Sequence, residues 1–375
     1  MNKEHINYTL LFLAIFFIVS SSIFLSCLSS TASLQRFGTT NYYLIHQVLS
    51  GYLPGIILGF IAYRISLKFI KKWTPLFVVL NIAALFSVFI PGLGFKAGGA
   101  SRWVDLGFFS FQPSEILKIT AILYLSAWIA SKLSEESVSG WKEFTKKSYH
   151  NVIYIFLPFI IFLGVISIAL YFQRDVSTLG IITLTLLNLY FTSRTPLWHT
   201  LLIVASGVTI LLLLVKFEPY RLDRWMVFLH PQDDPLGKGL QLKQSLISLG
   251  SGGVFGKGLG MSAEKFFLPE PMTDSIFAII GEEMGMIGGL VLVAAFVYLF
   301  WIGIKIAKKS TDRFSKMMAV GIVTWITLQA FINMAQVAGI FPVAGIPLPF
   351  FSYGGTHVVV ELVGIGLLLN ISKNT

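Results

Sequence analysis

The chain has 375 residues, of which 55% are hydrophobic and only 12% are charged, and its formal net charge is +10. In a soluble domain about a quarter of the residues are charged, so this composition excludes a soluble globular protein. The single cysteine, Cys27, excludes an internal disulfide and a multi-cysteine metal site. These features predict an all-α, polytopic membrane protein.

Apolar runs of membrane-spanning length follow one another along almost the whole chain. A spanning helix needs about 20 mostly apolar residues, and about ten runs meet that requirement. They cover residues 8–28, 43–65, 74–93, 113–131, 152–172, 176–192, 197–216, 275–304, 316–340 and 351–371. The sequence therefore predicts about ten transmembrane helices in a single membrane domain, 1–375.

Lysine and arginine are concentrated in alternate loops between these runs. The loops after the second, fourth and eighth runs carry most of them, and Arg194 follows the sixth. This bias is typical of cytoplasmic loops and places both termini in the cytoplasm. The basic excess then reflects topology and attraction to anionic lipid, so we expect membrane lipid and no nucleic acid among the partners. The polar segment 218–273, between helices 7 and 8, becomes one large extracytoplasmic loop.

Two short outer segments contain polar residues of interest. Pro113 and Glu115 suit the first turn of the fourth helix, and a simple helix start would explain them. Lys118 lies inside that helix, where an ammonium group is costly and is by default a functional candidate. Arg174 and Asp175, between the fifth and sixth helices, form either an exposed turn pair or an outer rim that meets polar substrate groups.

The long outer loop contains a glycine-rich stretch and a stretch with helical periodicity. The first lacks the serine or threonine that follows the lysine of a phosphate-binding loop, because Gly258 follows Lys257. We expect instead a backbone that closely approaches a bulky ligand. Leu242, Leu246 and Leu249 recur at helical spacing, which predicts an amphipathic helix at the membrane interface.

Three acidic residues stand at or inside the predicted eighth helix. Asp274 directly precedes that helix, where it could cap the helix or act as a general base at the membrane edge. Glu282 and Glu283 lie two turns deeper and need partners, for which Lys118 and backbone amides are candidates. A structural ion pair and a catalytic role therefore both stay open for the two glutamates.

The last third of the chain contains further patterned residues. Glycines at 281, 285 and 289 are spaced by four, which predicts close helix packing. His357 and Glu361 are one helical turn apart and can satisfy each other. Proline and glycine break the segment 342–356, so its backbone must be buried by protein or line a wet cavity.

Together these segments resemble the SEDS family, the shape, elongation, division and sporulation polymerases that include FtsW, RodA and SpoVE. The matching motifs are GASRW at 99–103, FQPSE at 111–115, DDPLG at 233–237, GSGG at 250–253, LPEPMTD at 268–274, GEE at 281–283 and PLPFFSYGG at 347–355. The resemblance covers nearly the whole chain, and its motifs are most similar to the FtsW and SpoVE branches. The chain departs from the family pattern at Arg174, Ser275, Thr356, His357 and Glu361.

The resemblance implies an enzyme, a peptidoglycan glycosyltransferase. Members of the family polymerise lipid II at the outer face of the bacterial cytoplasmic membrane and release polyprenyl diphosphate. They work with a class B penicillin-binding protein transpeptidase, and an FtsW-like member also works with other divisome membrane proteins at the septum. The resemblance implies that Asp274 is the catalytic residue. The candidate substrate-binding residues are Arg102, Glu115, Lys118, Lys257, Glu270 and Glu283.

No metal-binding residues are assigned, although Mg²⁺ or Mn²⁺ could stabilise the leaving diphosphate. Three alternative functions stay open. Charged residues inside the membrane also mark transport pathways, so a transporter that moves lipid II is one alternative. A RodA-type elongation polymerase and a scaffold that recruits the partner synthase are the others.

Overall fold

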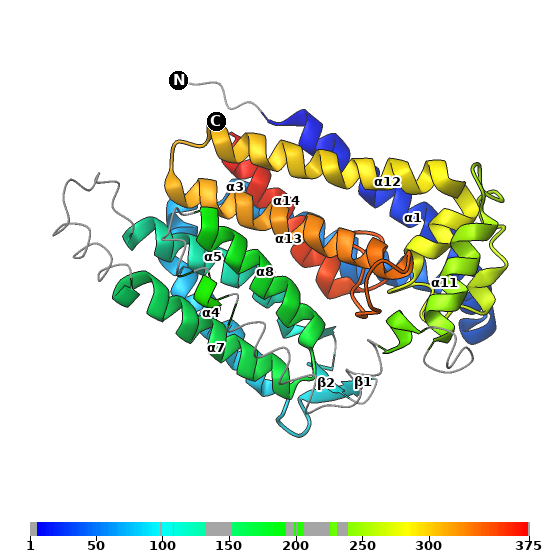
Figure 1. Ribbon diagram of the computed structural model, residues 1–375, viewed down its shortest axis with the longest axis horizontal. Helices are drawn as coiled ribbons and strands as arrows, with labels where there is room; N and C mark the ends of the chain where they lie inside the picture. Colours follow the sequence, from blue (N-terminus) through cyan, green and yellow to red (C-terminus); the bar gives the residue numbers. More distant parts are fainter. Residues whose placement is uncertain are drawn as a thin grey trace.

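The computed structural model describes residues 6–97, 100–107, 109–132, 152–192, 199, 201–203, 205, 226–230 and 239–373. Within these residues, eight helices are long and apolar enough to cross a membrane. They run along the long axis of the molecule as a bundle (Figure 1). The predicted polytopic, helical architecture is therefore confirmed, while most of the predicted seventh helix, 197–216, lies outside the described residues.

The helices follow the predicted apolar runs with small shifts at their ends. Their bounds are α1 Tyr8–Phe37, α2 Tyr42–Gln47, α3 Leu53–Arg64, α4 Leu67–Ser87, α5 Pro113–Lys132, α7 Leu157–Phe172, α8 Val176–Thr192, α11 Leu240–Ser251, α12 Ile276–Lys309, α13 Arg313–Val337 and α14 Gly355–Ser372. A π-helical turn, Val48–Tyr52, joins α2 to α3, so that these pieces form a single span. A second π-helical turn, Val152–Phe156, leads into α7, and a 3-10 turn, Glu264–Phe266, interrupts the outer loop.

A small antiparallel sheet was not predicted from the sequence. Its strands are β1 Gly94–Ala97, β2 Ala100–Asp105 and β3 Ser110–Phe111, in the order β1-β2-β3. Phe95 pairs with Trp103, and Val104 pairs with Phe111. Aromatic and β-branched residues favour such paired positions, but the surrounding apolar runs hid this signal.

The bundle buries its polar side chains and exposes apolar ones. Helices α5, α13 and α14 are mostly buried, whereas the outward faces of α1, α4, α7 and α12 carry exposed leucine, isoleucine and phenylalanine. This pattern suits a protein surrounded by lipid, because polar groups are costly in hydrocarbon and collect where protein can satisfy them.

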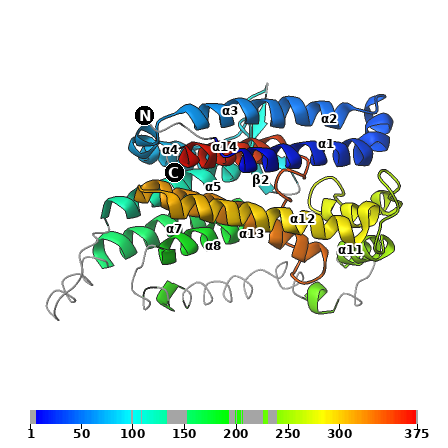
Figure 2. The ribbon, with the colours of Figure 1, turned by 90° about the horizontal axis from the view of Figure 1, so that it is seen from above.

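The two ends of the bundle differ. The start of α1 and the end of α14 lie at one end, and the α1–α2 turn and α11 lie at the other (Figure 1 and Figure 2). Hydrogen bonds join the sheet, the α7–α8 turn, the start of α12 and the segment 338–354 at this second end. The residues of the predicted site therefore meet at the end opposite the two termini.

Candidate active site

Asp274 lies at the end of the long polar segment and is half-buried. The N-cap position of α12 is occupied by the neighbouring Ser275, whose side chain is fully buried and makes no capping hydrogen bond. The expectation that Asp274 could be the helix cap is therefore wrong by one position. Its carboxylate faces Gly345, where a β-carbon would lie 3.4 Å from Oδ2 of Asp274.

The backbone around Asp274 is held by the segment 338–354. The side-chain amide of Asn333 donates to the carbonyl of Asp274 at 2.9 Å and to that of Ile346 at 2.7 Å. Ser352 donates through its hydroxyl to the carbonyl of Thr273 at 2.6 Å. These bonds fix Asp274 against the proline- and glycine-broken segment, which is buried by protein as predicted.

Glu270 forms a tight turn just before Asp274. Its φ of 50° is unusual for a residue other than glycine. Its carbonyl accepts from the amides of Thr273 and Ser275, and its carboxylate accepts from the hydroxyl of Thr273 at 3.1 Å. Glu270 is exposed, so its charge lies at the surface close to Asp274 along the chain.

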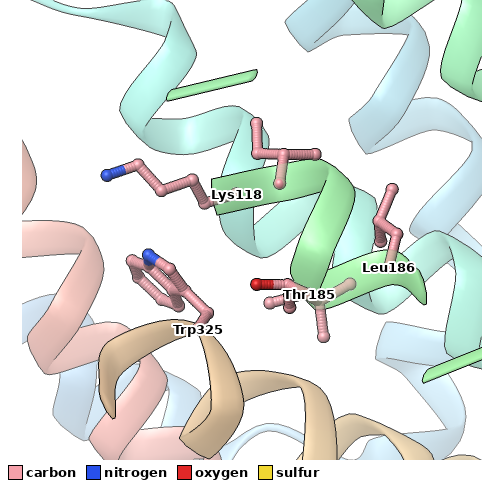
Figure 3. Close-up of a pocket in the computed structure, with 6 residues that line it drawn as sticks. Lys118, Thr185, Leu186 and Trp325 are labelled. Atoms are coloured by element: carbon pink, nitrogen blue, oxygen red, sulfur yellow. The ribbon is translucent and has the colours of Figure 1, made fainter. Parts of the chain in front are cut away.

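Glu115 and Lys118 form a buried ion pair on α5. Their charged atoms lie 2.8 Å apart, and the residues are only 4% and 2% exposed. Lys118 also donates to Gln329 on α13 at 2.8 Å, and the ring of Trp325 lies beside it (Figure 3). A narrow apolar gap, lined in part by Thr185 from α8, adjoins the lysine stem. The amine is therefore paired with α5 and α13, and the expected link to Glu282 or Glu283 is wrong.

Two side-chain amides of α13, those of Gln329 and Asn333, connect the Glu115–Lys118 pair and Asp274 to the segment 338–354. The side-chain amide of Gln329 donates to the carbonyl of Pro347 at 3.1 Å. Asn333 donates to the adjacent carbonyl of Ile346 and to Asp274. Gln329 and Asn333 are fully buried. Sequence reasoning missed both, although polar residues at 329, 333 and 336 share one face of an apolar helix.

The partners of Arg102 are backbone carbonyls of the α7–α8 turn. Its guanidinium donates to the carbonyl of Gln173 at 3.3 Å and to that of Arg174 at 2.5 Å. Asp175 is buried and accepts from the hydroxyl of Ser114 at 2.9 Å. Arg174 is exposed, but Asp175 is buried and bound to Ser114 at the start of α5, so the two residues do not form an exposed turn pair.

Glu282 and Lys257 form a second ion pair, 2.7 Å apart. Glu282 also accepts from the hydroxyl of Ser262 at 2.5 Å and from that of Ser248 at 3.2 Å. Glu283 is 1% exposed, and neither of its carboxylate oxygens has a well-aligned hydrogen bond in the described structure. The amine of Lys257, a candidate substrate-binding residue, is therefore paired with Glu282 and holds its loop to α12.

The glycine-rich loop packs against a break in α12. Gly285 has a φ of 67° and interrupts the helix. The amides of Lys257 and Gly258 donate to the carbonyls of Glu282 and Glu283 at 2.9 and 3.0 Å. A β-carbon at Gly256 would lie 2.2 Å from the Glu283 carbonyl oxygen. The predicted close backbone approach is therefore real, but its partner is α12 and not a ligand.

Gly281 and Gly285 do not form the expected contact between spanning helices. A β-carbon at Gly281 would lie 2.4 Å from the side chain of Leu249 on α11, and Gly285 faces the loop. Helix α11 forms where the leucine spacing predicted a helix, but the three leucines do not share one buried face. Its buried residues are Leu242, Ser245 and Ser248, whereas Leu246 is exposed.

His357 and Glu361 satisfy each other as predicted. Nδ1 of the histidine lies 3.3 Å from the carboxylate, whose other oxygen accepts from the amide of Phe350 at 2.7 Å. Another residue that departs from the family pattern, Thr356, accepts from the amide of Gln112 at 3.3 Å. These three side chains therefore join α14 to its neighbours.

The arrangement matches that of known proteins along its whole length. The sequence profile of a family described as cell cycle protein, named for FtsW, RodA and SpoVE, matches residues 7–375. The chain belongs to the FtsW/RodA/SpoVE family. It is 36% identical over 323 residues to stage V sporulation protein E of Bacillus subtilis (strain 168), covering 85% of this chain and 84% of that relative.

Other relatives and solved structures agree with this assignment. A protein described as probable peptidoglycan glycosyltransferase FtsW, from Coxiella burnetii (strain RSA 493 / Nine Mile phase I), is 36% identical over 92% of this chain and 91% of its own length. A chain of a peptidoglycan synthase complex has a TM-score of 0.75 at 20% identity, covering 98% of this chain and 97% of its own. The crystal structure of Thermus thermophilus RodA has a TM-score of 0.70 at 20% identity, with coverages of 99% and 98%. At that identity the two structures show the shared fold.

Proposed function

We propose that this FtsW/RodA/SpoVE family member is a peptidoglycan glycosyltransferase that polymerises lipid II, with Asp274 as the general base. The observation that carries the proposal is the placement of Asp274 at the end of the bundle opposite the two termini, half-buried and with its backbone carbonyl bound by Asn333. A carboxylate held in this way can accept a proton from a hydroxyl that lies beside it. Among the relatives, several are named probable peptidoglycan glycosyltransferase FtsW.

The reaction needs one proton acceptor and a stabilised leaving group. The acceptor sugar hydroxyl attacks the anomeric carbon of the second lipid-linked sugar, and its proton passes to Asp274. The bond between that carbon and the polyprenyl diphosphate breaks, and the diphosphate leaves with the electron pair. Lys118 is bound to Glu115 and Gln329, and Arg102 is bound to two backbone carbonyls. Both cations therefore have a structural role beside the site.

A divalent cation would fit this site only with the help of substrate. In the described chain no three histidine, cysteine, aspartate or glutamate side chains form a metal-binding group. Asp274 and Glu270 could supply two carboxylates, and Mg²⁺ commonly takes its remaining ligands from water and substrate phosphates. Such an ion would neutralise charge on the leaving diphosphate.

The charged residues in and beside the helical bundle do not favour the transporter alternative. Glu115 with Lys118, and Glu282 with Lys257, are paired within the fold. We propose a membrane-bound transpeptidase as the partner, since the solved chain of similar fold comes from a peptidoglycan synthase complex. We also propose cytoplasmic termini and a role at the division septum, which depletion should reveal as filaments rather than spheres.

The decisive experiment is polymerisation of lipid II by the purified protein with its partner synthase in detergent. We expect Asp274→Asn to abolish glycan chains on a gel while the protein stays folded. Glu264→Gln, a carboxylate change in the same outer loop, should leave chain synthesis near the wild-type rate. Polymerisation by Asp274→Asn at the wild-type rate would remove Asp274 from the mechanism.

A further inference from the structure

The glycine-rich part of the long loop carries large apolar side chains that the described residues leave exposed. Phe255 is 82% exposed and Met261 is 70% exposed, and Val254 and Leu259 are about half exposed. A contiguous exposed apolar surface usually marks an interaction site. The residues 254–261, here called the apolar loop, therefore need a covering partner.

The length of α12 locates this loop relative to the membrane. The part of the helix after the break at Gly285, residues 286–309, is roughly 36 Å long at about 1.5 Å per residue, enough to cross a hydrocarbon core of about 30 Å. Its inner end is marked by Trp301 and by Lys305, whose amine lies 4.9 Å from the centre of the Trp301 ring. Aromatic and basic residues of this kind mark a membrane interface.

Counting outward from Lys305 places the other boundary. About 20 residues span the hydrocarbon, and 20 positions before Lys305 is Gly285, where α12 is broken. The helix beyond the break carries lipid-facing residues such as Met286 and Leu290, which are exposed. The first turns of α12, on the other side of the break, fold back beside this part of the helix, because a β-carbon at Gly289 would lie 3.7 Å from the ring of Phe277.

The apolar loop is fixed at the level of this break. The amide of Met286 donates to the carbonyl of Gly253 at 2.9 Å, and that of Ile287 donates to Val254 at 3.2 Å. The amides of Lys257 and Gly258 bond to α12 on the other side of Gly285. Phe255 therefore stands at the calculated outer edge of the hydrocarbon.

We infer that the apolar loop is a membrane anchor that inserts Phe255 and Met261 into the outer interface of the bilayer. Insertion into lipid removes the apolar surface of the Phe255 side chain from water, which favours the anchored position. The loop also carries Lys257, which binds Glu282 on the first half of α12. Anchoring this loop therefore fixes the first half of α12, which begins next to Asp274, relative to the bilayer.

The observations favour lipid over a protein as the covering partner. The loop lies level with the break in α12, to which its backbone is hydrogen-bonded. Directly after the break, Met286 and Ile287 are exposed on the lipid-facing side of α12, so the apolar surface of the loop continues onto that side. A soluble partner domain would have to reach the same depth as the hydrocarbon edge. The bilayer surface is already present at that depth.

Spin labelling in nanodiscs tests the inference on the full chain. In a Cys27→Ala background, a nitroxide is attached at Phe255→Cys, at Met261→Cys, or at Thr39→Cys as a control. Thr39 is exposed and lies in the turn between α1 and α2 at the same end of the bundle. Collisions with oxygen, which concentrates in lipid, are compared with collisions with a water-soluble nickel chelate.

We expect labels at 255 and 261 to collide several-fold more with oxygen than the control label does, and less with nickel. Equal nickel access at 255 and 39, with the 261 label agreeing, would overturn the inference. Protection from nickel that appears only after the partner synthase is added would also overturn it, because the covering surface would then be protein. The second label keeps the test decisive if one variant folds poorly.

Discussion

Asn333 donates a hydrogen bond from its side-chain amide to the backbone carbonyl of Asp274, 2.9 Å away. The same amide donates to Ile346, so one buried side chain of α13 joins the start of α12 to the segment that faces the Asp274 carboxylate. The position of the proposed base therefore depends on a residue of another helix.

Asn333→Ala should lower the turnover number without a matching change in KM, because Asn333 orients Asp274 and does not contact substrate. The change leaves two carbonyls without this donor, at a cost of about 1–3 kcal/mol each when they stay buried. Gln336→Ala is the matched control, since Gln336 binds Ala344 and Ile346 but not Asp274. Steady-state kinetics should show the larger fall in Asn333→Ala, and equal falls would contradict a positioning role.

Gly345→Ala should reduce polymerisation more than it reduces stability. Gly345 has a φ of 67°, and its new β-carbon would lie 3.4 Å from the Asp274 carboxylate. Gly38→Ala places alanine at a φ of 70° with open space around it. Left-handed backbone costs roughly 1–2 kcal/mol in both variants, so similar melting temperatures with lower activity only in Gly345→Ala are expected. Full activity in Gly345→Ala would show that this contact has no catalytic consequence.

Single changes in the Glu115–Lys118 pair should be more destabilising than the double change. Removing one partner leaves a buried charge uncompensated, which costs about 3–5 kcal/mol. The variants are Glu115→Gln, Lys118→Met and the two combined. Thermal unfolding in detergent should give a favourable coupling between the two positions. Additive losses would indicate that the ion pair does not stabilise the bundle.

Gly256→Ala should strongly destabilise the outer loop. Its φ is 82°, and a β-carbon would lie 2.2 Å from the carbonyl oxygen of Glu283, which cannot move without shifting α12. Gly253→Ala is the control, because its φ is also positive, 55°, and nothing lies within 4 Å of the added carbon. Limited proteolysis should cut the loop faster in Gly256→Ala. Equal cleavage rates of the two variants would show that the positive φ, and not the contact with Glu283, destabilises the loop.

Tyr353 should stay neutral through the working pH range. Burial, and next the nearby Tyr42 and Tyr43, raise the pKa of Tyr353 to about 12 from its ordinary value of 10.0. Because the folded pKa is the higher one, the stability it contributes is complete below pH 10 and is lost as the pH rises through about 12. The phenolate absorbance of wild type minus Tyr353→Phe should therefore rise near pH 12. A step at pH 10 would show that the phenol is solvated.

The sequence by itself determined the class of protein, the approximate spans and the family. Composition and the length of the apolar runs are local properties, and a span in lipid satisfies its own backbone hydrogen bonds, so each helix could be predicted without its neighbours. Asp274 could be selected because it stands where a polar segment meets a span, and the motif that contains it is also local.

Only the tertiary structure decided which charges from distant segments meet. Lys118 pairs with Glu115 on its own helix, while Glu282 pairs with Lys257 from the outer loop. The amides of Gln329 and Asn333 become part of the site because α13 is surrounded by other elements. The Glu115–Lys118 pair follows from its spacing of three residues on one helix. The other hydrogen bonds and ion pairs also act over a few ångströms, but they join distant segments, so their partners are fixed by packing and not by spacing along the chain.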